Sequence, residues 1–416
     1  MGAQLNPAET LSTADFEPRA ARRHRAGLVW TLVFQISTVI GIIALVALLV
    51  TVLNNAFGYV AIEYTVNPAT LTNGPLEDAS TDELTAILQQ GVSAGLYRRL
   101  EADQPFAERT HANVLDLVYE RVVAPTVVQQ WTLIDSLFGR RAILRAAAAD
   151  YPNAEIVFQS WISARFISSP QSGTPAKAGV RTAILGSLWT VLIAFLMAFP
   201  IGVGAAIYLE EYARDSFVNR IIQVNINNLA GVPSIIYGML GLALFVRFLG
   251  RFTSGAAFGL ADPAAANGRT VLSAGLTLGL LVLPVIIINA QEAVRAVPGA
   301  LRQASLALGA TQWQTIWHHV LPMALPGIMT GTILSISRAM GETAPLVVVG
   351  ASTFVTVDPS GPFSKFTTLP IQIFQWTSRP QNVFRNIAAA AILVLLAMLL
   401  SLNTTAILLR NRYSRK

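Results

Sequence analysis

The chain has 416 residues, of which 53% are hydrophobic and only 12% are charged. Ordinary soluble domains contain roughly 25% charged residues, so lipid is the expected solvent for much of this chain. Cysteine is absent, which excludes disulfides and thiolate metal sites.

Six apolar runs are long enough to span a bilayer, which requires about 20 apolar residues with few charges. They cover residues 27–53, 180–209, 225–248, 271–289, 325–350 and 388–409. The first run is far longer than the apolar region of a cleaved signal peptide, which spans about 7 to 15 residues, so it is interpreted as an uncleaved anchor. The sequence therefore predicts an all-α membrane protein with six transmembrane helices.

Basic residues at both ends of the chain predict its orientation, because Lys and Arg near membrane helices are retained on the cytoplasmic side. They are Arg19, Arg22, Arg23 and Arg25 before the first run, and Arg410, Arg412, Arg415 and Lys416 after the last. Both termini are therefore expected to be cytoplasmic, which requires an even number of spans. The net charge of +6 is then mainly an orientation signal, not a sign of nucleic-acid binding.

This topology divides the chain into an N-terminus with the first helix (1–53), an extracytoplasmic insertion (54–179) and a five-helix core (180–416). The insertion is predicted to be mainly helical. Ser80 to Glu83 forms a capping box before an amphipathic run through Leu100, and residues 114–123 have apolar side chains at helical spacing. The stretch 170–177, rich in Pro, Ser and Gly, is typical of a linker.

The segment 291–322, between the fourth and fifth predicted helices, has the pattern of a helical hairpin. A short helix over 299–308 contains Gln303, Ala304 and Ser305, and Gly309 permits a turn with positive φ. A second helix over 312–320 is expected to stop at Leu321-Pro322, because proline cannot continue the hydrogen-bond ladder. We expect this cytoplasmic loop to present a rigid surface to a partner.

The spacing of this segment resembles the EAA coupling motif of ABC importer permeases. In that motif Glu-Ala-Ala, a Gly four residues later and a terminal Leu-Pro dock into a cleft of the ATPase subunit. Gln303 stands where the family usually has Glu, and His319 where it usually has an apolar residue. The resemblance implies that Gln303, Ala304, Ser305, Gly309, Leu321 and Pro322 couple the chain to an ATPase.

Two charges, Arg338 and Glu342, lie in the middle of the fifth predicted helix. Each charge at bilayer depth costs roughly 2.5 to 3.5 kcal/mol on insertion scales, so the face that carries them is expected to point away from lipid. Their spacing of four places them on one helix face, with Ser335 on the same stripe. A structural ion pair is one interpretation, and a substrate pathway is the other.

The chemistry of the pair favours an oxyanion pathway. Arginine presents a planar fork of donors that matches tetrahedral oxyanions and stays protonated at low dielectric. Glu342 could neutralise Arg338 in the empty pathway and accept a hydrogen bond from a protonated phosphate, which sulfate cannot donate. Pro233 and Pro345 are predicted kinks because they adjoin polar residues, among them Thr343, which is included in the predicted pathway.

Several segments resemble signatures of the PstA family of phosphate ABC transporter permeases. They are Ala-Ile-Tyr-Leu-Glu-Glu-Tyr (206–212), Asn-Leu-Ala-Gly-Val-Pro-Ser (228–234), Ser-Arg-Ala-Met-Gly-Glu-Thr-Ala-Pro-Leu (337–346), Leu-Pro-Ile-Gln-Ile (369–373) and Leu402-Asn403. Some members carry an Arg where this chain has Asn289, which leaves Arg338 as its main cationic element. Arg295 and Arg302 are assigned to the cytoplasmic loop, where orientation and docking explain them.

The resemblance implies a type I ABC importer permease in a bacterial inner membrane. The implied partners are a homologous second permease, two cytoplasmic ATPase subunits that bind ATP and magnesium, and an extracytoplasmic phosphate-binding protein. The chain itself needs no cofactor on this hypothesis, and no Gly-x4-Gly-Lys-Ser/Thr run is present, so it is not expected to be an ATPase.

Three alternatives remain at this stage. One is a permease for another oxyanion, such as sulfate, molybdate or a phosphonate. Another is a membrane-anchored receptor, which would leave the hairpin and the charged pair without a purpose. The third is a membrane-anchored enzyme, but the histidines (His24, His111, His318 and His319) do not cluster. Charges of the insertion, such as Arg98, Arg99, Arg140 and Arg141, are interpreted as a solvated face or as a docking surface.

Overall fold

A computed structural model describes residues 20–72, 74–173, 175–260, 268–351 and 354–414. The chain forms two compact units, Met1–Val52 and Leu53–Lys416. Helix α1 (Ala20–Ala56) accounts for the described part of the first unit and contains the predicted run 27–53. Arg19, Arg415, Lys416 and the side chains of Arg22 and Arg23 lie outside the described residues.

Within the described residues, five helices are long and apolar enough to cross a membrane. They are His24–Ala56, Arg181–Tyr212, Val271–Arg295, Gln312–Gly341 and Asn382–Arg412. The predicted span 225–248 is instead a pair of helices, Phe217–Ala230 and Ser234–Phe248, bent by 106°. The all-α membrane fold is confirmed, and the count reaches six if this bent pair is one span.

Long helices form the second unit's core, and small residues let them pack closely. The elements are α8 (Arg181–Ile207), α9 (Phe217–Ala230), α10 (Ser234–Gly241), α11 (Gly250–Thr253), α12 (Val271–Arg295), α13 (Gly299–Ala307), α14 (Gln312–Thr315), α15 (Leu321–Gly341), α16 (Ala344–Val349), α17 (Leu369–Thr377) and α18 (Asn382–Ser414). Gly275 and Gly279 of α12 lie against Ile193 and Met197 of α8, where an added Cβ would be within 2.8 Å of those side chains. This is the close approach that small residues allow between membrane helices.

Two helices of the core are broken, and their second halves pack against each other. The first break, between α9 and α10, falls at Gly231 to Pro233, because Pro233 lacks an N–H and disfavours helical geometry in the residue before it. The second corrects the predicted span 325–350, since α15 ends at Gly341 and a separate helix α16 follows. Gly238 of α10 sits directly on Pro345 of α16, where a Cβ would lie 2.6 Å from the proline Cα.

A three-stranded antiparallel sheet in the insertion was not predicted. Strands β1 (Phe57–Glu63), β2 (Thr126–Gln130) and β3 (Glu155–Ser160) are ordered β2-β1-β3, with Val60 opposite both Gln130 and Val157. The helices around it are α2 (Thr81–Gly91), α3 (Ala94–Asp103), α4 (His111–Val118), α5 (Leu133–Phe138), α6 (Arg140–Asp150) and α7 (Ala164–Ser168). Both bonds of the predicted capping box are present at Ser80, but the run through Leu100 is split because Ser93 caps a new helix.

The insertion and the membrane helices share one hydrophobic core. Trp161 and Phe166 of the insertion are buried with Trp376 of α17 and Phe384 of α18. The predicted linker is also packed, since Gln171 is buried and donates to Gln375 Oε1 at 2.7 Å. The stretch 170–177 is therefore not a free tether, and both parts belong to the same compact unit.

Candidate functional site

Arg338 and Glu342 meet at the end of a helix, not in its middle. Arg338 occupies the last turn of α15, and Glu342 is the first residue beyond it, with φ −75° and ψ 125°. The Nε atom of Arg338 lies 3.4 Å from Oε1 of Glu342, and the two side chains are 57% and 19% exposed. The mid-helix placement predicted from sequence is therefore corrected: the pair spans a break.

The other two predicted pathway residues differ in their surroundings. Ser335 is buried, and its hydroxyl donates to the Gly331 carbonyl of its own helix at 2.9 Å. It therefore does not share the exposed surface of Arg338. Thr343 follows the pair directly and is the N-cap residue of α16, with no side-chain cap hydrogen bond. The structure thus brings Arg338, Glu342 and Thr343 together at the break and leaves Ser335 in the helix interface.

Neighbouring signature residues hold the break in place. The hydroxyl of Ser337 donates to Asn403 of α18 and to the Ile333 carbonyl, the latter at 2.8 Å. At the other break, the hydroxyl of Tyr237 donates to the Leu229 carbonyl at 2.7 Å. The carboxamide of Asn289 lies 3.5 Å from the Gly331 carbonyl, so this residue sits where α12 crosses α15.

The predicted helical hairpin is present as α13, a turn and α14. Gly309 has φ +85°, the left-handed conformation that the sequence required. The buried hydroxyls of Ser305 and Thr315 are 2.9 Å apart and join the two helices. Gln303 and Ala304 are exposed on the outer side of α13.

The two ends of the predicted loop 291–322 are corrected. Helix α12 continues to Arg295, so Gln291 is a buried helical residue and not part of the loop. The second helix does not stop at Leu321-Pro322, because a π-helical segment, Ile316–Val320, leads directly into α15. Pro322 lies directly after this segment, at the start of α15, and does not end the helix.

A network of five polar side chains joins this hairpin to the end of α8, and we call it the Glu210–Glu211 network. Its members are Glu210, Glu211, Gln291, Arg295 and Arg302. Arg295 binds Glu210 through two hydrogen bonds of 2.7 Å, and Gln291 donates to the same carboxylate at 3.0 Å. Glu210 therefore anchors the last turns of α12.

The second half of the network is more deeply buried. Arg302 of α13 donates to Glu211 at 2.7 Å and 3.0 Å, and two further N–H groups donate to the carbonyls of Val294 and Val297 at 2.9 Å and 2.7 Å. Gln312 of α14 also donates to the Glu211 carbonyl. Orientation and docking alone do not explain Arg295 and Arg302. The signal in the sequence was the adjacent acid pair at the end of an apolar run, where basic residues are usual.

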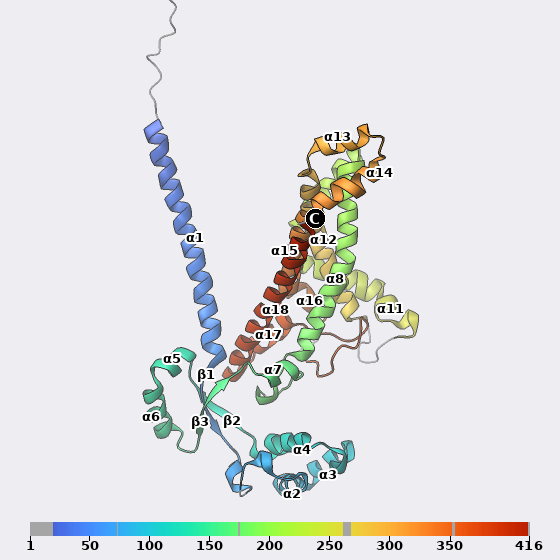
Figure 1. The fold of residues 1–416 in the computed structure, drawn as a ribbon. Helices are drawn as coiled ribbons and strands as arrows, with labels where there is room; N and C mark the ends of the chain where they lie inside the picture. Colours follow the sequence, from blue (N-terminus) through green and yellow to red (C-terminus); the bar gives the residue numbers. More distant parts are fainter. Residues whose placement is uncertain (1–19, 73, 174, 261–267, 352–353, 415–416) are drawn as a thin grey trace, which may run out of the picture. The chain divides into compact units, whose positions relative to one another are not determined.

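Large apolar side chains are exposed on the hairpin. Leu306, Leu308, Trp313 and Trp317 are each at least half exposed, and the two tryptophan rings stack with centroids 5.5 Å apart. In Figure 1, α13 and α14 lie at the opposite end of α8 and α12 from the insertion. Several exposed large apolar side chains on one short segment are typical of a protein interface.

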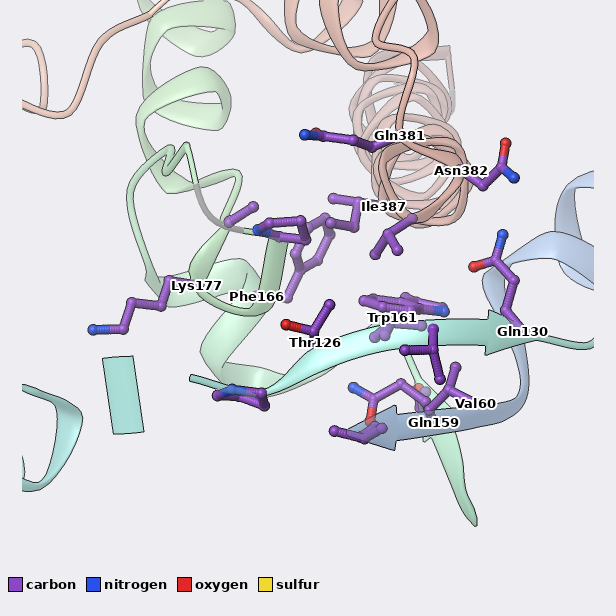
Figure 2. Close-up of a pocket in the computed structure, with 18 of the residues that line it drawn as sticks. Val60, Thr126, Gln130, Gln159, Trp161, Phe166, Lys177, Gln381, Asn382 and Ile387 are labelled. Atoms are coloured by element: carbon purple, nitrogen blue, oxygen red, sulfur yellow. The ribbon is translucent and has the colours of Figure 1, made fainter. Parts of the chain in front are cut away.

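A cavity of about 620 Å³ lies elsewhere, between the insertion and the start of α18. Figure 2 shows Trp161 and Phe166 between strand residues such as Val60 and the α18 residue Ile387. Lys177 lines one end, but its ammonium is paired with Glu120 at 2.7 Å. Neither Arg338 nor Glu342 lines this cavity, so it is distinct from the predicted pathway.

The chain has long apolar helices, two broken helices in contact, and a hairpin fixed to the end of α8. These features are those of a multi-pass membrane protein of the transporter permease class. The chain belongs to the family of binding-protein-dependent transport system inner membrane components, which matches residues 198–416. This membership identifies the chain as a transporter permease.

Two relatives are named as permeases, and one of them carries the PstA name. The chain is 36% identical over 234 residues to the phosphate transport system permease protein PstA 1 of Mycobacterium tuberculosis, covering 56% of this chain and 70% of that one. It is 34% identical over 218 residues to the probable ABC transporter permease protein YqgI of Bacillus subtilis, covering 52% and 68%. A solved bacterial alginate ABC transporter is similar with a TM-score of 0.44 and 15% identity, over 75% of this chain and 95% of that one.

Proposed function

We propose that this chain is the transmembrane permease subunit of an ATP-driven phosphate importer and forms half of its translocation pathway. The observation that carries the proposal is the loosely joined pair at a helix break, in which Arg338 is exposed and Glu342 is half-buried. The pair lies within residues 198–416, which match the transport family. Relatives named as phosphate permeases are 36% identical to this chain over 234 residues.

The geometry of the pair supports an oxyanion as the cargo. Within the described residues Arg338 donates one hydrogen bond, from Nε to Glu342, which leaves the terminal amino groups of the guanidinium available. Those donors suit a phosphate oxygen, and the adjacent carboxylate can accept a hydrogen bond from protonated phosphate. A fully deprotonated oxyanion such as sulfate would leave the repulsion from Glu342 uncompensated.

The hairpin supports coupling to a cytoplasmic ATPase. Its exposed apolar side chains suit a protein cleft, and the Glu210–Glu211 network would transmit movement of the hairpin to α8 and α12. On this proposal Gln303, Ala304 and Gly309 belong to the docking surface, and the buried Ser305 supports it by joining the two helices of the hairpin. Leu321 and Pro322 form its junction with α15. Both termini would be cytoplasmic.

The remaining partners follow from the proposed importer. They are a homologous second permease that completes the pathway, two ATPase subunits that bind ATP and magnesium, and an extracytoplasmic phosphate-binding protein. The assembled complex would lie in a bacterial inner membrane.

Phosphate uptake by the assembled complex tests the pathway. We expect Arg338→Gln to lower uptake about tenfold or more, because a charge-assisted hydrogen bond to the anion is lost. Arg385→Gln is a matched control, because Arg385 is also an exposed arginine but lies in the first turn of α18. Normal uptake by Arg338→Gln and Glu342→Gln, with normal assembly, would contradict the proposed roles.

The cargo is tested separately by competition. If Glu342 excludes fully deprotonated anions, Glu342→Gln should let sulfate compete with phosphate for uptake, while the parent complex resists it. Equal competition in both complexes would favour a permease for oxyanions in general.

A further inference from the structure

Helices α5 and α6 of the insertion carry an exposed surface that is both apolar and basic. Leu137 and Phe138 of α5 are 66% and 88% exposed, and Ile134 and Leu144 are 46% and 42% exposed. Arg141 and Arg145 are exposed on the same two-helix segment. Side chains of this size on short helices are usually turned toward a core, so their exposure requires an explanation.

Both helices have a buried inner face, so the exposed apolar side chains are not the result of a helix that packs against nothing. Ser136, Ile143 and Ala147 are buried, which leaves the opposite side of each helix uncovered. The Ser136 hydroxyl accepts a hydrogen bond from the Tyr59 backbone N–H at 2.9 Å, which fixes α5 against β1. The segment is therefore packed into the insertion on one face, and its opposite face is not covered by the rest of the described chain.

A hydrogen bond ties α5 to the point where the chain leaves the membrane. The backbone N–H of Ile134 donates to Oδ1 of Asn54 at 2.8 Å. Asn54 immediately follows the apolar run 27–53. Chain connectivity therefore places the start of α5 next to the membrane surface, and Figure 1 shows α5 beside the start of β1.

The arginines of this segment differ from other basic residues of the insertion. Within the described residues Arg140, Arg141 and Arg145 form no ion pair, whereas Arg165 and Lys177 pair with Asp116 and Glu120. The nearest acid on α5, Asp135, is engaged by the Thr132 hydroxyl at 2.7 Å. The basic groups are thus free to bind phosphate oxygens of lipid headgroups.

We propose that α5 and α6 form an interfacial membrane anchor that binds the leaflet on the insertion's side. Leu137 and Phe138 enter the boundary between headgroups and acyl chains, and Arg141 and Arg145 bind anionic headgroups. This combination of apolar and basic side chains is typical of helices that lie in a membrane surface. The anchor fixes the height of the insertion above the bilayer and does not depend on which anion the permease carries.

Single-cysteine labelling tests this proposal, because the chain has no cysteine of its own. The full chain carrying Leu137→Cys or Phe138→Cys is labelled with an environment-sensitive fluorophore. It is then reconstituted into nanodiscs of phosphatidylcholine and phosphatidylglycerol with brominated acyl chains. Gln90→Cys, exposed at the end of α2, is the matched control. We expect about twofold or greater quenching at 137 and 138 and none at 90.

Two outcomes would overturn the anchor. A label at both positions that stays accessible to an aqueous quencher means that the surface faces water. A label that is shielded but not quenched by brominated lipid means that protein covers it.

A charge variant tests the headgroup part. Leu137→Cys combined with Arg141→Gln and Arg145→Gln should retain quenching but lose its increase with phosphatidylglycerol content. An unchanged dependence on that lipid would exclude the arginines from headgroup binding.

Discussion

The Glu210–Glu211 network and the Arg338–Glu342 pair use the same chemistry in opposite ways. In the network, Arg302 and Glu211 are 23% and 9% exposed, and the guanidinium has four hydrogen bonds. In the pair, Arg338 is mostly exposed and makes a single contact of 3.4 Å. An arginine with most of its N–H groups already hydrogen-bonded fixes the geometry around it. An arginine with one hydrogen bond keeps donors that can bind a ligand.

The difference teaches where rigidity is placed in this permease. If the hairpin is to transmit force, it must move as one body with α8 and α12. The ion pairs of the Glu210–Glu211 network join these elements and so make such a movement feasible. The pair at the break must exchange partners during transport, so a strong contact there would oppose its proposed role.

The largest effect on stability is expected from Glu211→Gln. Removing one partner of a buried ion pair leaves the other charge uncompensated, so we expect a loss of about 3 kcal/mol in unfolding free energy. Denaturant unfolding of the purified chain in detergent measures it. Asp215→Asn is the control, because the Asp215–Arg220 pair is exposed. Equal effects of the two substitutions would remove the distinction between buried and exposed charges.

A smaller loss is expected at the hairpin turn. Gly309→Ala should cost about 1 to 2 kcal/mol, because φ +85° places an L side chain in the left-handed region. Gly299→Ala, in the first turn of α13 with nothing near its added Cβ, should be neutral or stabilising. Denaturant unfolding midpoints compare the two variants.

Gly309→Pro should abolish association with the ATPase. Retained association would show that the turn is not part of the docking surface.

Glu342→Gln should change the unfolding free energy by less than about 1 kcal/mol, because its partner Arg338 is mostly exposed and the two are joined by one contact of 3.4 Å. Transport should nevertheless fall, since the pathway is altered. Unfolding and uptake measured on the same preparation separate the two quantities. A loss of stability as large as that of Glu211→Gln would make the pair structural.

The smallest effect is expected at Tyr64, a partly buried tyrosine of the insertion. Burial first, and then a hydrogen bond to Glu155, raise the pKa of Tyr64 from 10.0 to about 12. The folded state therefore holds this proton more tightly, and the stability it contributes is complete below pH 10 and is lost as pH rises toward 12. Tyrosinate absorbance during alkaline titration measures it, with Tyr64→Phe as the control. An identical titration of both chains would contradict the assignment.

The sequence by itself determined what depends on near neighbours. The apolar runs, the Ser80 capping box, the helix of the hairpin and the Gly309 turn each follow from residues within a few positions of one another. The family also followed from short contiguous segments, among them the one that holds Arg338 and Glu342. Local hydrogen bonding and hydropathy are sufficient causes for these features, so no tertiary contact was needed to predict them.

Tertiary structure decided what depends on distant partners. The sheet joins β1 to β3 across about 100 residues, and Arg302 reaches Glu211 across 91. The sharp bend between α9 and α10 and the end of α15 at Gly341 change the surroundings of signature residues without changing their sequence. Charge and spacing identified Arg338 and Glu342 in the sequence. Only packing decides how many hydrogen-bond partners each charged side chain has, because burial and partners arise from contacts between separate elements.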